Sequence, residues 1–124
     1  MNQIIDIGLL GLGTVGTGVV NIINSPKGRH PLVSSINIAR IAVKDLNRPR
    51  SIKVDSSILT EDPFEIVNDP KIKLIVEAIG GIEPARSLIL SAIKSGKSVV
   101  TANKAVIARY GKEISDAANA AGVY

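Results

Sequence analysis

Three glycines near the start of the chain have the spacing of a phosphate-binding loop. Gly11, Gly13 and Gly16 follow a short apolar run and precede a stretch whose apolar residues recur every three or four positions. This order predicts a strand, a tight turn at Gly11 and a helix that packs closely on the strand at Gly16, with Gly13 leaving room for a phosphate group. The N–H groups of the first helical turn, at Thr14 and Val15, then have no partner within the helix and point toward that phosphate.

The glycine pattern by itself is a weak signal, because glycine is common and a glycine-rich turn need not bind anything. Its position between a predicted strand and a predicted helix is what makes it specific here. In this context residues 11–16 predict a site for the pyrophosphate of NAD or NADP.

A second group of candidate residues follows two later apolar segments. Ala78, Ile79 and Gly80 end one of them, and the glycine there lets the backbone approach a flat ring. Thr101, Asn103 and Lys104 follow the other. Because parallel sheets bind ligands outside the carboxyl ends of their strands, we expect Lys104 at the nicotinamide end, where it could orient a substrate carboxylate or take part in proton transfer. An exposed lysine at a helix start is the alternative. Glu77 is better interpreted as a supporting or capping carboxylate than as a ligand.

The charge of the chain is unevenly distributed. Residues 27–53 contain seven Lys and Arg residues against Asp45 alone, a net charge of +6, while the whole chain carries +4. A local basic region favours an anionic ligand, and a solvated basic loop is the alternative. Lys44 follows the predicted second strand and suits the 2′-phosphate of NADP, whereas Asp45 could bind the ribose of NAD. We expect NADP to be preferred over NAD.

The remaining pattern predicts the elements that position these residues. We expect strands at 4–10, 36–43, 58–59, 74–79 and 98–101, and helices at 14–24, from Asp62-Pro63, from Glu83-Pro84 to Gly96, and at 105–121. Alternating strands and helices predict an α/β fold, a Rossmann-type doubly wound parallel sheet with helices on both faces. We expect 1–124 to be one NAD(P)-binding domain. Because residues 122–124 look like the start of a sixth strand, we also expect the chain to be a fragment of a longer enzyme.

Composition argues against several other functions. The chain has no cysteine, which excludes disulfides and thiolate metal sites, and its single histidine, His30, is assigned no role, so we expect no metal site. One Phe and two Tyr are the only aromatic residues, too few for a protein that stacks nucleic-acid bases. No apolar run approaches the roughly 20 residues of a membrane span. We expect a soluble, cytoplasmic protein without nucleic-acid or membrane partners.

Four segments together resemble the amino-terminal, NAD(P)-binding part of homoserine dehydrogenase. They are GLLGLGTVG from Gly8, AVKDL from Ala42, VEAIGGIEPA from Val76 and VVTANKA from Val99. The glycine loop is shared by many dehydrogenases, whereas the last two segments are much more specific. The resemblance runs nearly the whole length of the chain.

The resemblance implies reversible NAD(P)-dependent interconversion of L-aspartate 4-semialdehyde and L-homoserine, in threonine, methionine and isoleucine biosynthesis. It implies that Lys104 lies between cofactor and substrate, that Thr101 and Asn103 line the nicotinamide side, and that residues 78–80 contact the cofactor along its length. It places Lys44 where the family often has arginine. It also implies a homodimer and a substrate region beyond these residues, so we expect this chain to bind cofactor without oxidising homoserine.

Two alternatives stay open at the level of the sequence. A regulatory nucleotide-sensing module has a similar length and glycine loop, but it has no need for a lysine at the nicotinamide end. Another NAD(P)-dependent oxidoreductase of the same build would differ mainly in the substrate region.

Overall fold

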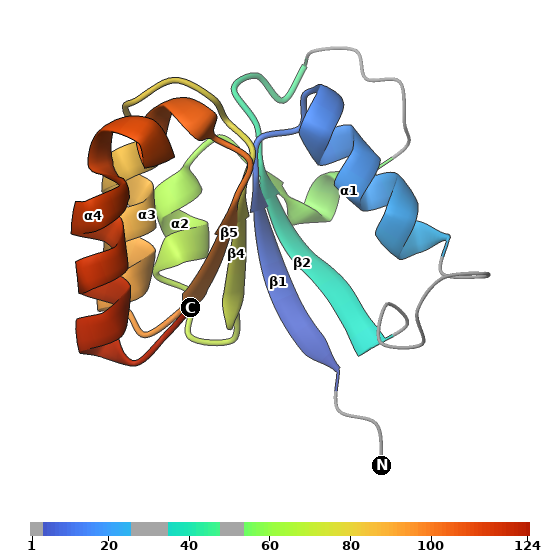
Figure 1. Ribbon diagram of the computed structural model, residues 1–124. Helices are drawn as coiled ribbons and strands as arrows, with labels where there is room; N and C mark the ends of the chain where they lie inside the picture. Colours follow the sequence, from blue (N-terminus) through green and yellow to red (C-terminus); the bar gives the residue numbers. More distant parts are fainter. Residues whose placement is uncertain (1–3, 26–34, 48–53) are drawn as a thin grey trace.

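The strands form one parallel sheet (Figure 1). The structure is a computed structural model that describes residues 4–25, 35–47 and 54–124. Within these residues the strand order is β3-β2-β1-β4-β5, and every neighbouring pair is parallel. The strands are β1 (Ile5–Leu10), β2 (Ile36–Ala42), β3 (Leu59–Thr60), β4 (Leu74–Glu77) and β5 (Ser98–Thr101). The helices are α1 (Thr14–Asn24), α2 (Pro63–Val67), α3 (Ala85–Lys94) and α4 (Lys104–Ala121), with a short 3-10 turn η2 (Ser56–Ile58).

The predicted α/β class and order of elements are confirmed, and the differences lie at the ends of elements. β3 begins one residue later than predicted because Ile58 completes η2, which the Asp55 side chain caps by accepting the N–H of Ser57. β4 ends at Glu77, two residues earlier than predicted. The N–H of Ile79 bonds the side chain of Glu77 instead of a neighbouring strand, so the ladder stops there.

Both faces of the sheet are covered by helices. Figure 1 shows α1 on one side of the sheet and α2, α3 and α4 on the other. Leu9 belongs to the apolar cluster beneath α1, while its neighbour Leu10 belongs to the cluster beneath α2 and α3, and neither is exposed. Successive side chains of a strand point to opposite faces, so a doubly covered strand must be apolar at every position. This is why the buried part of β1, residues 7–10, has no polar side chain, whereas Asp6 lies before it near the exposed start of the strand.

The helix α4 packs on α3 rather than on the middle of the sheet. Val106 contacts the buried stripe of α3, formed by Ala85, Ile89 and Ile93. Gly122 ends α4 in the left-handed region, with φ +70°. The chain then returns to β5, where the N–H of Val99 donates to the carbonyl oxygen of Tyr124 at 2.9 Å. Residues 122–124 do not form the strand that the sequence suggests, although this bond joins them to β5.

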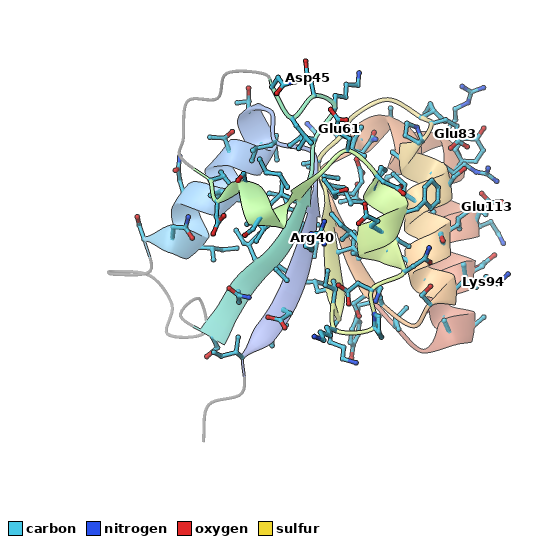
Figure 2. All side chains as sticks on the ribbon, turned by 180° about the vertical axis from the view of Figure 1, so that it is seen from behind. Arg40, Asp45, Glu61, Glu83, Lys94 and Glu113 are labelled. Atoms are coloured by element: carbon cyan, nitrogen blue, oxygen red, sulfur yellow. The ribbon has the colours of Figure 1, made fainter. Side chains whose placement is uncertain are left out.

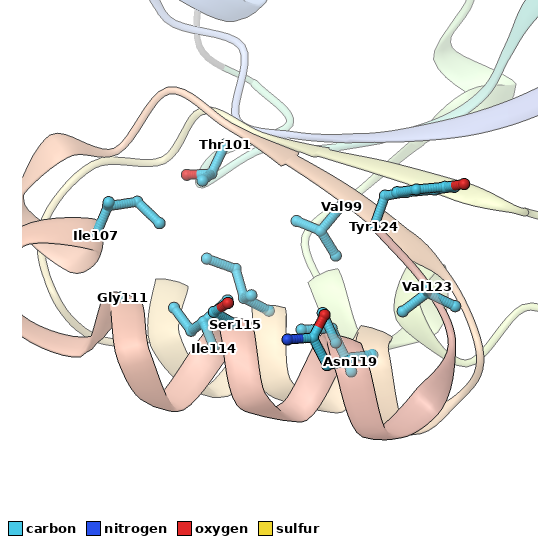
Figure 3. A pocket seen from close by; sticks show the side chains of 12 residues that line it. Val99, Thr101, Ile107, Gly111, Ile114, Ser115, Asn119, Val123 and Tyr124 are labelled. Atoms are coloured by element: carbon cyan, nitrogen blue, oxygen red, sulfur yellow. The ribbon is translucent and has the colours of Figure 1, made fainter.

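A pocket of about 430 Å³ lies between β5, α3 and α4 (Figure 3). Its lining is mainly apolar and includes Val99, Ile107, Ile114 and Val123. Across the described parts of the chain, no helix is long and apolar enough to cross a membrane, and no three acidic or histidine side chains gather to hold a metal ion. His30 lies outside the described residues.

A buried lysine, Lys97, bonds the loop before β4 from its position just before β5, at the amino end of these strands. Lys97 is 4% exposed, and its Nζ donates to the carbonyl oxygens of Asp69 at 2.5 Å and Ile72 at 2.6 Å. Burial lowers the pKa of the Lys97 ammonium, and the negative charge of Asp69 partly opposes this effect.

Replacing Lys97 with methionine should lower the free energy of unfolding by about 2–3 kcal/mol, because two carbonyl oxygens lose their buried donor. Urea unfolding followed by circular dichroism measures this. The control, Lys71→Met in the same loop, removes an exposed side chain and should change the free energy by at most about 0.5 kcal/mol.

The lowered pKa of Lys97 also predicts the direction in which stability changes with pH. Between the lowered pKa of folded Lys97 and its ordinary value of 10.5, the unfolded chain binds more protons, so stability rises with pH in that window. The difference between wild type and Lys97→Met should therefore widen as the pH approaches 10.5. A difference that is absent, or that shrinks with pH, would contradict this account.

Candidate cofactor-binding site

The glycine loop makes the tight turn and close packing that its spacing predicts. Gly11 lies in the left-handed region with φ +100°, and its N–H donates to the carbonyl oxygen of Ala42 at 3.0 Å. A Cβ on Gly11 would lie 2.7 Å from the carbonyl oxygen of Ala78, and a Cβ on Gly16 would overlap the carbonyl oxygen of Gly11. The loop therefore touches the ends of both strands that flank β1, and only glycine fits at these two positions.

The start of α1 has the properties of a phosphate cradle. Gly13 is the N-cap residue, no side chain caps the helix, and a Cβ placed on Gly13 would meet no atom within 4 Å. Thr14 and Val15 follow it and are exposed. Open space beside the uncapped N–H groups of a first helical turn suits the pyrophosphate of a dinucleotide, which the helix dipole also favours.

Glu77 organises the ends of β4 and β5. Its side chain is fully buried, and Oε2 accepts the N–H of Ile79 at 2.8 Å and that of Gly80 at 3.4 Å. Oε1 accepts the hydroxyl hydrogen of Thr101. Glu77 thus holds its own strand end and reaches across to the next strand, the supporting role that the sequence indicates.

Asn103 completes the contact between these strand ends. It is 6% exposed, and its Oδ1 accepts the N–H of Val106 at 3.1 Å, which caps α4. Its Nδ2 donates to the carbonyl oxygen of Gly81 at 2.5 Å, and its N–H donates to Oγ1 of Thr101 at 3.0 Å. Sequence reasoning assigned Asn103 to the nicotinamide side and missed its capping role. An asparagine directly before a predicted helix is the signal for that role.

An ion pair holds α4 against the start of α3. The guanidinium of Arg86 donates to both carboxylate oxygens of Glu113, at 2.7 and 2.8 Å, and lies 4.6 Å from the ring centre of Tyr110. Figure 2 labels Glu113 and Glu83, which lie on the same side of the molecule as α3 and α4. A hydrogen bond from Ser87 lowers the pKa of Glu83, with a smaller contribution from Arg86. The Arg86–Glu113 pair therefore joins α4 to the start of α3.

All of the predicted site residues lie at the carboxyl edge of the sheet, in an order set by the strands. Lys44 follows β2, residues 11–16 follow β1, residues 78–80 follow β4, and the Thr101–Lys104 segment follows β5. Gly11 brings the glycine loop into direct contact with Ala78, while Lys44 and Lys104 lie at opposite ends of this row. An extended dinucleotide laid along the edge would meet Lys44 at one end and Lys104 at the other.

The end of the row near Lys44 carries more negative charge than the sequence suggests. Lys44 is exposed, and two residues later the N–H of Leu46 donates to Oε2 of Glu61 at 2.9 Å. Asp45 accepts the N–H of Asn47 at 2.9 Å, and Figure 2 shows Asp45 and Glu61 at the same end of the molecule. Sequence reasoning missed Glu61, although an acid two residues after a predicted strand could have indicated it.

The basic region predicted from the sequence is only partly described. Arg40 is engaged within the fold, because it pairs with Glu65 at 3.6 Å and donates to the carbonyl oxygen of Ile58 at 3.3 Å. The other members except Lys44 lie outside the described residues: Lys27, Arg29, Arg48, Arg50 and Lys53. Lys44 is therefore the described cation of this region that a ligand at the edge could reach.

A parallel sheet of this strand order, with a glycine loop between β1 and α1, defines a Rossmann-type dinucleotide-binding domain. Residues 11–124 match the family model described as homoserine dehydrogenase, NAD binding domain. The chain therefore belongs to the homoserine dehydrogenase family, as its resemblance to that family predicts.

Similar proteins agree with this assignment. The chain is 55% identical over 120 residues to the homoserine dehydrogenase of Synechocystis, covering 97% of this chain and 28% of that protein. The crystal structure of Staphylococcus aureus homoserine dehydrogenase at pH 8.5 has 39% identity and a TM-score of 0.89, covering 99% of this chain and 31% of that one. The crystal structure of a homoserine dehydrogenase from Thiobacillus denitrificans has 40% identity and a TM-score of 0.81. The match covers 99% of this chain and 29% of that one. The chain thus spans less than a third of these relatives.

The glycine geometry predicts unequal losses of stability for two substitutions about one helical turn apart. Gly16→Ala should lower the free energy of unfolding by about 1–3 kcal/mol, because its Cβ would overlap the backbone of Gly11. Gly13→Ala faces open space and should change it by less than about 1 kcal/mol. Urea unfolding of both variants checks the contrast, and equal losses would show that the loop relaxes around an added methyl group.

Proposed function

We propose that this chain binds NADP or NAD along the carboxyl edge of its sheet, as the cofactor-binding domain of an enzyme that interconverts L-aspartate 4-semialdehyde and L-homoserine. The observation that carries the proposal is the open, uncapped start of α1 at Gly13, directly after β1 and next to the end of β4. When bound, the nicotinamide supplies hydride transfer. Residues 1–124 constitute the cofactor domain, and the substrate and dimerisation region belongs to the rest of a longer homodimeric enzyme.

On this proposal, different residues of the chain bind different parts of the cofactor. The N–H groups after Gly13, at Thr14 and Val15, bind the pyrophosphate. The backbone of residues 78–80 runs along the cofactor, and Thr101 and Asn103 lie on its nicotinamide side. The ammonium of Lys104, exposed at the start of α4, lies between cofactor and substrate as the catalytic residue, where it orients the substrate carboxylate or holds a proton for the alcohol oxygen.

The biological setting follows from the family. On this proposal the chain serves threonine, methionine and isoleucine biosynthesis and works in the cytoplasm. Its small-molecule partner in the intact enzyme is aspartate semialdehyde or homoserine.

Preference for NADP over NAD depends on the charges beside the end of β2. Lys44 is placed to bind a 2′-phosphate, and such a charge-assisted hydrogen bond contributes about 1.5–3 kcal/mol. Glu61 and Asp45 oppose a second negative charge at the same end. We propose that Lys44, with the basic residues flanking it in the sequence, outweighs them and that NADP is preferred.

Calorimetric titration of the chain with NADPH and NADH, at low and high salt, measures this balance. NADPH should bind more tightly, and the margin should shrink as salt screens the phosphate contact. Lys44→Ala should lose about tenfold of the NADPH affinity and little of the NADH affinity. Equal or tighter binding of NADH by the wild type would assign the ribose contact to Asp45 instead.

Gly13→Ala tests the pyrophosphate site within the same titrations. The added methyl group occupies the space that the phosphate needs, so both cofactors should bind at least about tenfold more weakly to a protein that is still folded. Unchanged binding by this variant would remove the glycine loop from the site.

The chain should not oxidise homoserine by itself, because the relatives it matches are more than three times as long and the proposed substrate region lies outside it. A spectrophotometric assay of NADPH formation from homoserine and NADP checks this. Turnover above a no-enzyme blank would show that the 124 residues contain a complete active site.

A further inference from the structure

Glu77 is the acidic side chain that is fully buried in the described part of the chain. It is the last residue of β4, where it lies opposite Leu10 of β1 on one side and Thr101 of β5 on the other. The carbonyl oxygen of Glu77 also accepts the N–H of Ala102 at 3.1 Å. Its carboxylate therefore lies between the glycine loop and the nicotinamide end of the proposed site.

The hydrogen bonds around Glu77 form a closed ring. The ring runs from Glu77 through the backbone of residues 79–81 to the side chain of Asn103, then to Thr101 and back to Glu77. The hydroxyl oxygen of Thr101 accepts the N–H of Asn103, so its own hydrogen points to Glu77. We refer to this set of residues as the Glu77 ring.

Every neighbour that bonds the Glu77 carboxylate is a donor. Oε2 accepts two backbone N–H groups and Oε1 accepts the Thr101 hydroxyl, and among the described residues no Lys or Arg pairs with it. Only an acceptor-only group satisfies donors on both of its oxygens. A glutamine would present its NH₂ group to one of these donors. Burying a charge without a cationic partner is costly, so the ring depends on these bonds being made together.

We propose that Glu77 is a positioning residue for the cofactor, acting through the backbone of Ile79 and Gly80 and through the Thr101 hydroxyl on the nicotinamide half alone. This inference rests on the proposed function, which lays the nicotinamide along these residues. The adenosine half lies across β1, at the end of β2, where the Glu77 ring makes no contact. Loss of the Glu77 carboxylate therefore weakens binding of the complete dinucleotide and leaves binding of its adenosine half unchanged.

The test compares two ligands on the 124-residue chain. Calorimetry gives the affinities for NADPH and for adenosine 2′,5′-bisphosphate, which is the adenosine half of NADPH. Glu77→Gln should bind NADPH about tenfold more weakly, as expected when a buried donor loses its acceptor, and adenosine 2′,5′-bisphosphate within about twofold of wild type. The matched control is Glu83→Gln, the same substitution at an exposed carboxylate outside the ring, which should change neither affinity.

Three further measurements keep the outcome decisive. Amide hydrogen exchange of Ile79 and Gly80 should be faster in Glu77→Gln, whether or not cofactor is present. Thr101→Val removes one donor of the ring and keeps the shape of the side chain, so it should show the same selective loss even where Glu77→Gln fails to fold. Asp at position 77 keeps two acceptor oxygens on a shorter stem, so Glu77→Asp should recover part of the NADPH affinity that Glu77→Gln loses.

Equal losses for both ligands in the folded variants, or no loss for either, would overturn the positioning role. A wild-type chain that binds neither ligand would instead overturn the proposed function. In that event unchanged exchange at Ile79 and Gly80 would overturn the ring as well, whereas faster exchange would leave its effect on the backbone established.

Discussion

The carboxyl edge of the sheet depends on how closely the Gly11 backbone approaches its two neighbouring strands. Gly11 takes a left-handed conformation, bonds Ala42 at the end of β2, and passes within contact distance of Ala78 at the end of β4. A side chain at this point would push the three strand ends apart. Because α1 starts from this turn, the same approach decides where the first N–H groups of the helix point, and so where a phosphate can bind.

The second constraint on the carboxyl edge of the sheet is the set of hydrogen bonds around Glu77, at the end of β4. The fold buries the Glu77 carboxylate at the end of β4 and surrounds it with hydrogen-bond donors from β5 and from the loop that follows β4. Asn103 then connects that loop to the first turn of α4. Two strand ends and one helix start are thereby tied together by polar side chains, whereas the apolar clusters between the sheet and its helices consist of aliphatic side chains.

The two ends of the site differ in how they are held. At the end near Lys104, the side chains of Thr101 and Asn103 are hydrogen-bonded within the protein, and Lys104 extends from a capped helix. At the end near Lys44, the residues Lys44, Asp45 and Glu61 are exposed, and the N–H of Leu46 donates to Glu61 between the two loops. Side chains that are buried and hydrogen-bonded to one another tolerate few substitutions. Exposed charged side chains contribute less to stability and can be substituted one at a time. On the proposed function, the chemistry would take place at the hydrogen-bonded end and the choice between NADP and NAD at the exposed end.

Local patterns in the sequence determined most of the fold and the outline of the site. The periodicity of apolar residues, the Asp62-Pro63 cap and the glycine spacing act within a few residues of one another, so the order of elements and the position of the glycine loop could be predicted. The hydrogen bonds from Thr101 to Glu77 and from Leu46 to Glu61 could not be predicted, because they join residues 24 and 15 positions apart. Which side chains meet there depends on the register of parallel strands and on which face each residue takes. Only the packing of helices on both faces of the sheet decides that.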